Sequence, residues 1–117
     1  MIVLDFGSLP TLPVRNFQSH GASSLDLGKG QGDVHVHTLR FEPGGEVGTH
    51  PAGFDQIFFV LSGRAWAVGE GGRKELDPGQ GAFFARGEHH SKGSDTGALT
   101  IVLQVTDLTL KRTLFLR

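Results

Sequence analysis

Short runs of alternating apolar and polar residues, closed by glycine or proline, dominate this chain. Residues 34–42 and 99–106 alternate with a period of two, which is typical of β-strands. Further strands are predicted at residues 2–6, 55–61, 64–68, 74–76, 82–85 and 108–116. Apolar residues nowhere recur at helical spacing, and the 18 glycines indicate many tight turns. The pattern therefore predicts an all-β chain of roughly eight to ten short strands.

Residues 17–33 lack this alternation and are predicted to form a loop. The run Gly28-Lys29-Gly30-Gln31-Gly32-Asp33 lacks the Lys-Ser/Thr pair of a phosphate-binding loop, and no helical pattern follows it. We therefore expect a turn there. Pro10 and Pro13 lack a backbone N–H, so the segment before this loop is not expected to pair regularly as a β-strand.

The stretch from residue 44 to residue 63 combines a glycine-rich corner, one histidine and an apolar run. Alternate residues of a strand share a face, so one face is predicted to hold His50, Ala52, Gln56, Phe58 and Val60. The other face would hold Asp55, Ile57, Phe59 and Leu61. Because both faces are apolar, the sheet must be covered on both sides, as in a sandwich or a closed barrel. His50 and Gln56 interrupt an apolar face, and buried polar groups need partners, so both are candidates for a functional site.

Composition excludes several classes of protein. The chain has 117 residues, which suits a single domain. Its 11 basic and 12 acidic residues leave a net charge of −1, so the basic footprint of a nucleic-acid-binding protein is missing. No apolar run approaches the ~20 residues of a membrane helix, and the N-terminus does not resemble a signal peptide, so we expect a cytoplasmic protein without membrane contact. Thiol nucleophiles and phenolic acids are excluded because the chain contains neither cysteine nor tyrosine.

Two motifs within residues 44–94 resemble those of the cupin superfamily, whose members are small jelly-roll barrels that usually hold one metal ion. At the positions of the first motif stand Gly44-Gly45, His50, Ala52, Gln56 and Gly63. At the positions of the second motif stand Gly79, Ala85, Gly87, His90 and Ser94. The spacing agrees throughout, but Ala52, Gln56, Ala85 and Ser94 depart from the family side chains, and two of those positions are metal ligands in the family.

The resemblance implies an all-β fold, a single-domain cupin jelly-roll β-barrel of the RmlC-like type. One cupin domain would span residues 1–117, with an N-terminal strand and loop arm over residues 1–33 and the barrel motifs at residues 44–63 and 79–94.

In the family, imidazoles and one carboxylate hold a divalent metal inside the barrel. Here the resemblance implies a weak or degenerate mononuclear site of His50, Gln56 and His90, with His37 as a third imidazole or a substrate contact. Such a site would take one divalent transition ion (Mn, Fe, Ni or Zn). The neutral amide of Gln56 is a weaker ligand than a carboxylate, and this raises the cost of burying a dication. The alternative is a metal-free pocket in which His50 and His90 are bonded to each other through water.

The predicted ligand pocket is lined by His35, Phe58, Phe84, Ile101 and Leu103. His89 is expected to face solvent, because neighbouring strand residues point to opposite sides and His90 points inward. The resemblance implies a small-molecule-binding cupin, which as an enzyme would be of the metal-dependent oxygenase or isomerase type. The alternatives are a metal-free binding or sensing module without catalysis and a purely structural dimer. No catalytic residue follows from the sequence.

The apolar face of Ile57, Phe59 and Leu61 requires a cover. Exposed apolar strand faces are a liability that a partner sheet removes, and the family resemblance implies a homodimer. We therefore predict a homodimer that binds a small-molecule ligand.

Overall fold

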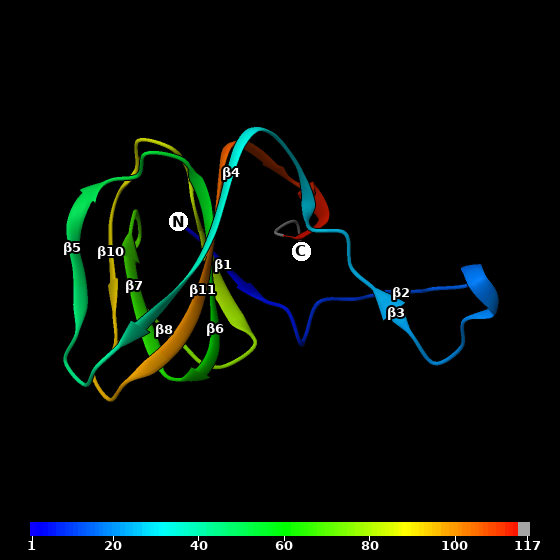
Figure 1. The fold of residues 1–117 in the computed structure, drawn as a ribbon, viewed down its shortest axis with the longest axis horizontal. Helices are drawn as coiled ribbons and strands as arrows, with labels where there is room; N and C mark the ends of the chain where they lie inside the picture. Colours follow the sequence, from blue (N-terminus) through cyan, green and yellow to red (C-terminus); the bar gives the residue numbers. More distant parts are fainter. Residues whose placement is uncertain (115–117) are drawn as a thin grey trace.

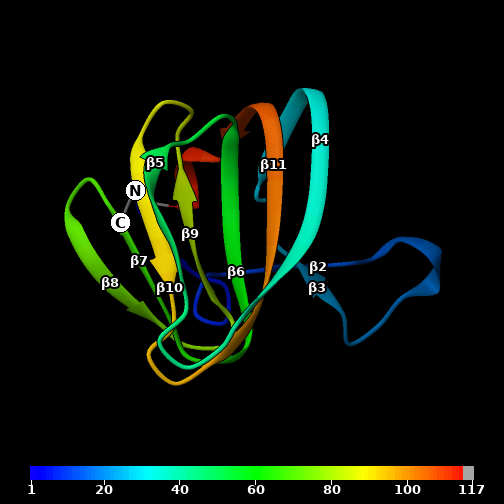
Figure 2. The same ribbon diagram turned by 60° about the vertical axis from the view of Figure 1, so that its left-hand side comes forward.

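The fold consists of two facing antiparallel β-sheets and a projecting arm (Figures 1 and 2). The computed structural model describes residues 1–114. One sheet contains five strands, in the spatial order β1 (Ile2–Asp5), β9 (Gln80–Phe84), β6 (Asp55–Gly63), β11 (Ala98–Leu110) and β4 (Gly28–Phe41). The other contains four, in the order β5 (Glu46–Pro51), β10 (His89–Gly93), β7 (Ala65–Gly69) and β8 (Gly72–Leu76). The predicted all-β class and jelly-roll layering are confirmed, although over residues 1–114 the two sheets remain separate ladders that do not close into a barrel.

An apolar cluster fills the space between the two sheets. The five-stranded sheet contributes Phe58 of β6 and Val102 of β11, which lie opposite each other in register and are fully buried. The four-stranded sheet contributes Ala65 and Ala67 of β7 and Leu76 of β8. Small side chains on one sheet thus face aromatic rings on the other, as interdigitated sheet packing requires.

A second apolar cluster covers the outer face of the five-stranded sheet. Ile57 of β6 packs there with Leu4 and Leu9 from the N-terminal segment and with Leu110 and Leu114 from the C-terminal segment. The arm then leaves the body as β2 (Leu12–Pro13), the 3-10 helix η1 (Asn16–Gln18) and β3 (Ser23–Ser24) (Figure 1). The sheet is therefore covered on both faces near its centre, as the apolar run at residues 55–61 predicts.

The turn predicted over residues 28–33 is wrong, because this run is the first half of β4 and pairs with the end of β11. Its glycines allow the two strands to approach closely. A Cβ on Gly30 would lie 2.7 Å from Cγ1 of Val105, and a Cβ on Gly32 would lie 2.6 Å from Cβ of Thr106. A register shift between Val105 and Asp107 marks the same place as a β-bulge.

The predicted C-terminal strand over residues 108–116 is also wrong in part. β11 ends at Leu110, and the 3-10 helix η2 (Arg112–Leu114) follows it. Residues 115 and 116 of that prediction lie outside the described residues. Conversely, β10 (His89–Gly93) is a strand that was not predicted from the sequence. Of the helices in the described part of the chain, none is long and apolar enough to cross a membrane.

Candidate functional site

The imidazoles of His50 and His90 meet on the inner side of the four-stranded sheet. β5 and β10 are neighbouring antiparallel strands, and their register places His50 directly opposite His90. The two Nε2 atoms are 3.3 Å apart, and the ring centroids are 4.7 Å apart. Two histidines separated by forty positions in the sequence are thus brought into contact.

The backbone around His50 determines which nitrogens of this pair carry hydrogen. Nδ1 of His50 lies 2.7 Å from the carbonyl oxygen of Gly48, which can only accept, so Nδ1 is the donor. The neutral ring then has a bare Nε2, which accepts the hydrogen bond from Nε2–H of His90. Nδ1 of His90 is left as a buried acceptor without a partner among residues 1–114.

His90 is held in its neutral form. The residue is only 1% exposed, and its ring stacks edge-on against Phe84 with a centroid distance of 4.4 Å. Burial, followed by the positive charge of Lys92 and the proximity of His50, lowers the pKa of His90 from 6.5 to about 4, and Glu88 opposes this shift. His50, by contrast, is exposed to solvent. The pair therefore has one buried member and one member that a ligand can reach.

A buried lysine lies on the same strand face as His90. Lys92 is 4% exposed, and its Nζ donates a hydrogen bond of 2.6 Å to Oε1 of Gln56 on the opposite sheet. Burial lowers the pKa of this ammonium from 10.5 to about 8. Lys92 was not predicted from the sequence as a site residue. The signal for it is the spacing of two that places residues 90 and 92 on one face of a strand.

The opposite wall of this space is formed by the inner face of the five-stranded sheet. Phe58 and Phe84 face inward, as predicted, and both are fully buried. His37 lies in register with Val102, which is part of the inner cluster, so it occupies the predicted side of β4. The residue is exposed, however, and no three acidic, imidazole or thiol side chains within residues 1–114 are grouped to hold a metal ion. His37 is therefore not assembled with His50 and His90.

His35 lies farther along β4, in register with Gln104. Its ring packs against Phe54 with a centroid distance of 5.3 Å, and the residue is exposed. This places His35 at the rim of the inner face. His89 is exposed, as predicted from its position beside His90.

The predicted pocket positions Ile101 and Leu103 are wrong. In the ladder between β11 and β6, Ile101 lies opposite Phe59, and Leu103 lies opposite Ile57. Phe59 and Ile57 belong to the outer apolar cluster, so this alternation faces away from the imidazoles. The inner positions of β11 are instead Thr100, Val102 and Gln104, as their register with the inner residues of β6 shows.

Two carboxylates near the imidazoles stabilise the backbone rather than the site. Asp55 points away from the inner face, as predicted, and accepts hydrogen bonds from the backbone N–H groups of Arg86 (2.7 Å) and Leu108 (2.8 Å). Burial alone would raise the pKa of Glu88, but hydrogen bonds from the Met1 amine and two backbone N–H groups hold it below the ordinary range.

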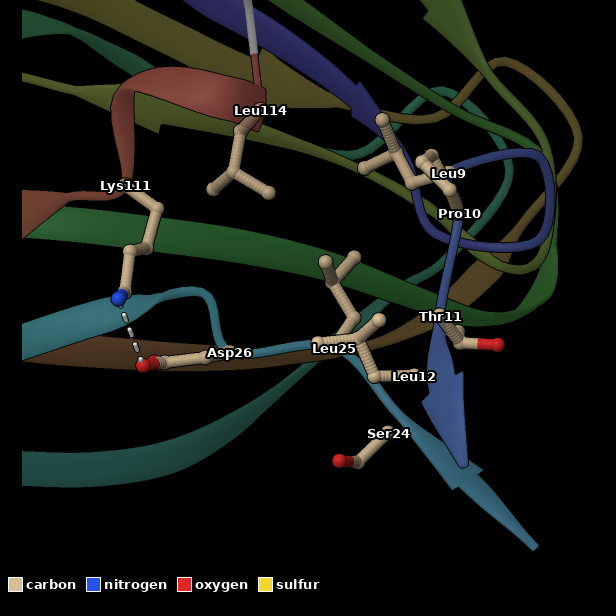
Figure 3. Close-up of a pocket in the computed structure, with 9 residues that line it drawn as sticks. All are labelled: Leu9, Pro10, Thr11, Leu12, Ser24, Leu25, Asp26, Lys111 and Leu114. Carbon is tan, nitrogen blue, oxygen red and sulfur yellow. Dashed lines mark ion pairs between the residues drawn. The ribbon is translucent and has the colours of Figure 1, made fainter. Parts of the chain in front are cut away.

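A pocket of about 260 Å³ lies on the outer side, between the start of the arm and η2 (Figure 3). Leu9, Leu25 and Leu114 line it, and the ion pair between Lys111 and Asp26 (3.3 Å) lies at its margin. None of its lining residues belongs to the inner face. This pocket is therefore separate from the imidazole pair.

Solved structures with the same two-sheet architecture establish the fold. An RmlC-like cupin from Shewanella frigidimarina is 22% identical, with a TM-score of 0.59 over 63% of this chain and 67% of that chain. A cupin-like protein from Thermotoga maritima is 21% identical, with a TM-score of 0.59 over 62% of this chain and 57% of that one. The chain has the cupin fold. A conserved protein of unknown function from Streptococcus pyogenes reaches a TM-score of 0.61 at 19% identity, over 66% of this chain and 68% of that chain.

One curated protein is similar to this chain in sequence. The (R)-mandelonitrile lyase of Granulicella tundricola is 37% identical over 65 residues, which are 54% of this chain. In this match the chain spans half the length of that relative. No protein-family model matches the sequence.

The residues of this chain do not fit a resident divalent ion as they are arranged. The 3.3 Å between the Nε2 atoms of His50 and His90 would allow both to bind one ion at about 2.1 Å each. The third predicted donor, Oε1 of Gln56, already accepts from the ammonium of Lys92. A metal-bound histidine normally donates its second N–H to an acceptor, and Nδ1 of His90 has none. We therefore derive no step through a metal ion.

Proposed function

We propose that this cupin binds a small organic molecule between its two sheets, beside the pair of His50 and His90. The observation that carries the proposal is the contact of an exposed imidazole with a buried one, beside the apolar cluster that fills the space between the sheets. Binding sites for small molecules are mostly apolar, with a few convergent polar groups that set the orientation of the ligand. Phe84 and Phe58 would contact the apolar part of the ligand, and the imidazoles its polar part.

The enzymatic form of this proposal is the cleavage of an α-hydroxynitrile, which the name of the similar lyase suggests. His50 is the residue we assign to the proton transfer, since it is exposed and its bare Nε2 can take a proton once the ligand hydroxyl replaces the Nε2–H of His90 there. The hydroxyl proton of the ligand would pass to Nε2, the carbon–carbon electron pair would leave with cyanide, and the C–O bond would become a carbonyl. The imidazolium would then return its proton to cyanide, so that the products are an aldehyde and hydrogen cyanide.

The test of catalysis is the release of benzaldehyde from racemic mandelonitrile, followed by absorbance under mildly acidic conditions that slow the uncatalysed reaction. We expect His50→Gln to lower the rate by about 10²- to 10⁴-fold, because it removes the proton acceptor. His20→Gln, a change at an exposed loop residue, serves as the matched control and should have no effect. Equal rates for the wild type and His50→Gln would contradict the assignment of His50.

The alternative to the enzymatic form of the proposal is a module that binds the ligand without catalysis. Backbone amide NMR spectra titrated with benzaldehyde and with benzyl alcohol separate the two. Shifts at residues of β5 and β10 without turnover of mandelonitrile would favour the binding module. If neither shifts nor turnover were observed, both forms of the proposal would be contradicted.

The predicted metal dependence is tested in the same samples. An oxygenase or isomerase of the metal-dependent type would need Gln56 to turn away from Lys92. We expect protein without a histidine tag to bind Mn²⁺, Fe²⁺, Ni²⁺ or Zn²⁺ only weakly in calorimetric titrations. Tight binding of one equivalent would restore the metal-dependent alternative.

We also propose that residues 1–117 form one domain and that a second copy covers the outer sheet face. Val34 and Val36 of β4 and Leu61 of β6 are 58%, 64% and 49% exposed. Apolar strand faces of this kind favour pairing with another sheet. Elution at the size of a homodimer is expected, and elution as a monomer at all concentrations would contradict it.

A further inference from the structure

Lys92 is a cation placed inside the fold by its position on β10. Its register partners are Val47 on β5 and Ala67 on β7, and both pack in or against the inner apolar cluster. Its Nζ also lies 5.5 Å from the ring centroid of Phe58. The ammonium is therefore surrounded mainly by apolar groups.

The hydrogen bonds of this ammonium are incomplete. A lysine ammonium has three N–H donors, and among residues 1–114 the acceptor is Oε1 of Gln56 alone. No carboxylate of the described chain forms an ion pair with Lys92. Of the two acids nearest to it in the sequence, Asp95 pairs with Arg73 (2.8 Å). The other, Glu88, is bonded to the Met1 amine and to backbone N–H groups. A buried charge without a counter-charge is costly, so two free donors favour an anionic partner.

The imidazole pair lies next to these donors. His90 and Lys92 are two positions apart on one strand face, which separates their Cα atoms by about 6.6 Å. A small group between their side chains can reach both. We propose that Lys92 binds a small monovalent anion, or the anionic group of a larger ligand, at the imidazole pair.

This inference rests on the proposed function and narrows its ligand class. The ligands would be compounds that carry, or release, a small anion. In the cleavage of an α-hydroxynitrile, the ammonium would stabilise the departing cyanide by charge and by its unused N–H donors. Lys92 thus supplies a positive charge in a site where the residues do not fit a metal ion.

The test uses azide, a small linear monovalent anion, with protein freed of metal by a chelator. Amide NMR titrations compare the wild type with Lys92→Met, which keeps the length of the side chain and removes its charge. We expect a saturable shift at residues of β10 in the wild type and a loss of affinity of about 10- to 100-fold in the variant. Lys74→Met, a change at an exposed lysine of β8, is the matched control and should bind azide like the wild type.

A measurement on the wild type alone guards against misfolding of the variant. In protein labelled at lysine, the ε-carbon signal of Lys92 should shift with azide while that of Lys74 does not. An unshifted Lys92 signal, or unchanged azide affinity in Lys92→Met, overturns the inference. If the imidazoles still respond to benzaldehyde in that case, the proposed function stands without the anion site. If they do not, both fail.

Discussion

Nζ of Lys92 and Oε1 of Gln56 form a hydrogen bond of 2.6 Å that joins the two sheets through their shared interior. Lys92 comes from the four-stranded sheet and Gln56 from the five-stranded sheet. Each residue alone would bury polar atoms in an apolar face without a partner, which is costly. The bond gives a partner to one N–H donor of Lys92 and to the amide oxygen of Gln56. The bond also occupies Oε1 of Gln56, the atom that was predicted from the sequence to bind a metal ion.

The first prediction concerns the stability of the fold at alkaline pH. The pKa of Lys92 is about 8 in the folded chain, below its ordinary value of 10.5. Between these values the unfolded chain binds more protons, so the free energy of unfolding should rise with pH across this window, by up to about 3 kcal/mol. Below pH 8 both states are protonated and the contribution is constant.

Denaturant unfolding at several pH values checks this, with Lys92→Met as the reference that lacks the titrating group. The stability difference between the variant and the wild type should shrink as the pH rises from 8 to 10.5. Parallel pH profiles of the two proteins would show that Lys92 has an ordinary pKa.

The second prediction concerns mildly acidic pH and His90. Burial, followed by the charge of Lys92, lowers the pKa of His90 from 6.5 to about 4. The unfolded chain therefore binds more protons between these values, and the free energy of unfolding should fall as the pH drops through this window, by up to about 3 kcal/mol. His90→Gln should lack this component, whereas His89→Gln, at the exposed neighbour, should retain it. An NMR titration in which the His90 ring protonates near pH 6.5 would refute the prediction.

The third prediction concerns Gln56→Glu. The added carboxylate would face the Lys92 ammonium directly and neutralise it. We expect azide affinity to fall by about tenfold, because the anion would then compete with an internal counter-charge. The matched control is Gln31→Glu, which adds the same charge at an exposed position of β4. Undiminished azide binding in Gln56→Glu would place the anion elsewhere.

The fourth prediction concerns the glycines of β4. A Cβ on Gly30 would lie 2.7 Å from Cγ1 of Val105 and 3.2 Å from the carbonyl oxygen of Asp107. Gly30→Ala should therefore destabilise the fold by about 1–3 kcal/mol, as overpacking does. Gly48→Ala, where a Cβ would meet no atom within 4 Å, is the control. Thermal unfolding measures both, and an unchanged midpoint in Gly30→Ala would mean that the strands separate freely there.

The sequence by itself determined the class of the fold and one contact of the site. Alternation and glycine spacing are local properties, and they were sufficient to predict the doubly covered run at residues 55–61 and the strands β1, β4, β6, β7, β8, β9 and β11 in whole or in part. The spacing of the two cupin-like motifs also identified His50 and His90, which the structure places in register on neighbouring strands.

Only the tertiary structure decided which strand faces meet and which buried groups pair. The inner positions of β11 include the polar Thr100 and Gln104, so alternation alone favoured the opposite orientation, with Ile101 facing inward. The observed orientation follows from the register with β6, since a slip of one residue exchanges the two faces of a strand. Lys92 became part of the site for the same reason. Its burial depends on an acceptor at Gln56, 36 positions away in the sequence and on the opposite sheet, and no local pattern records such a partner.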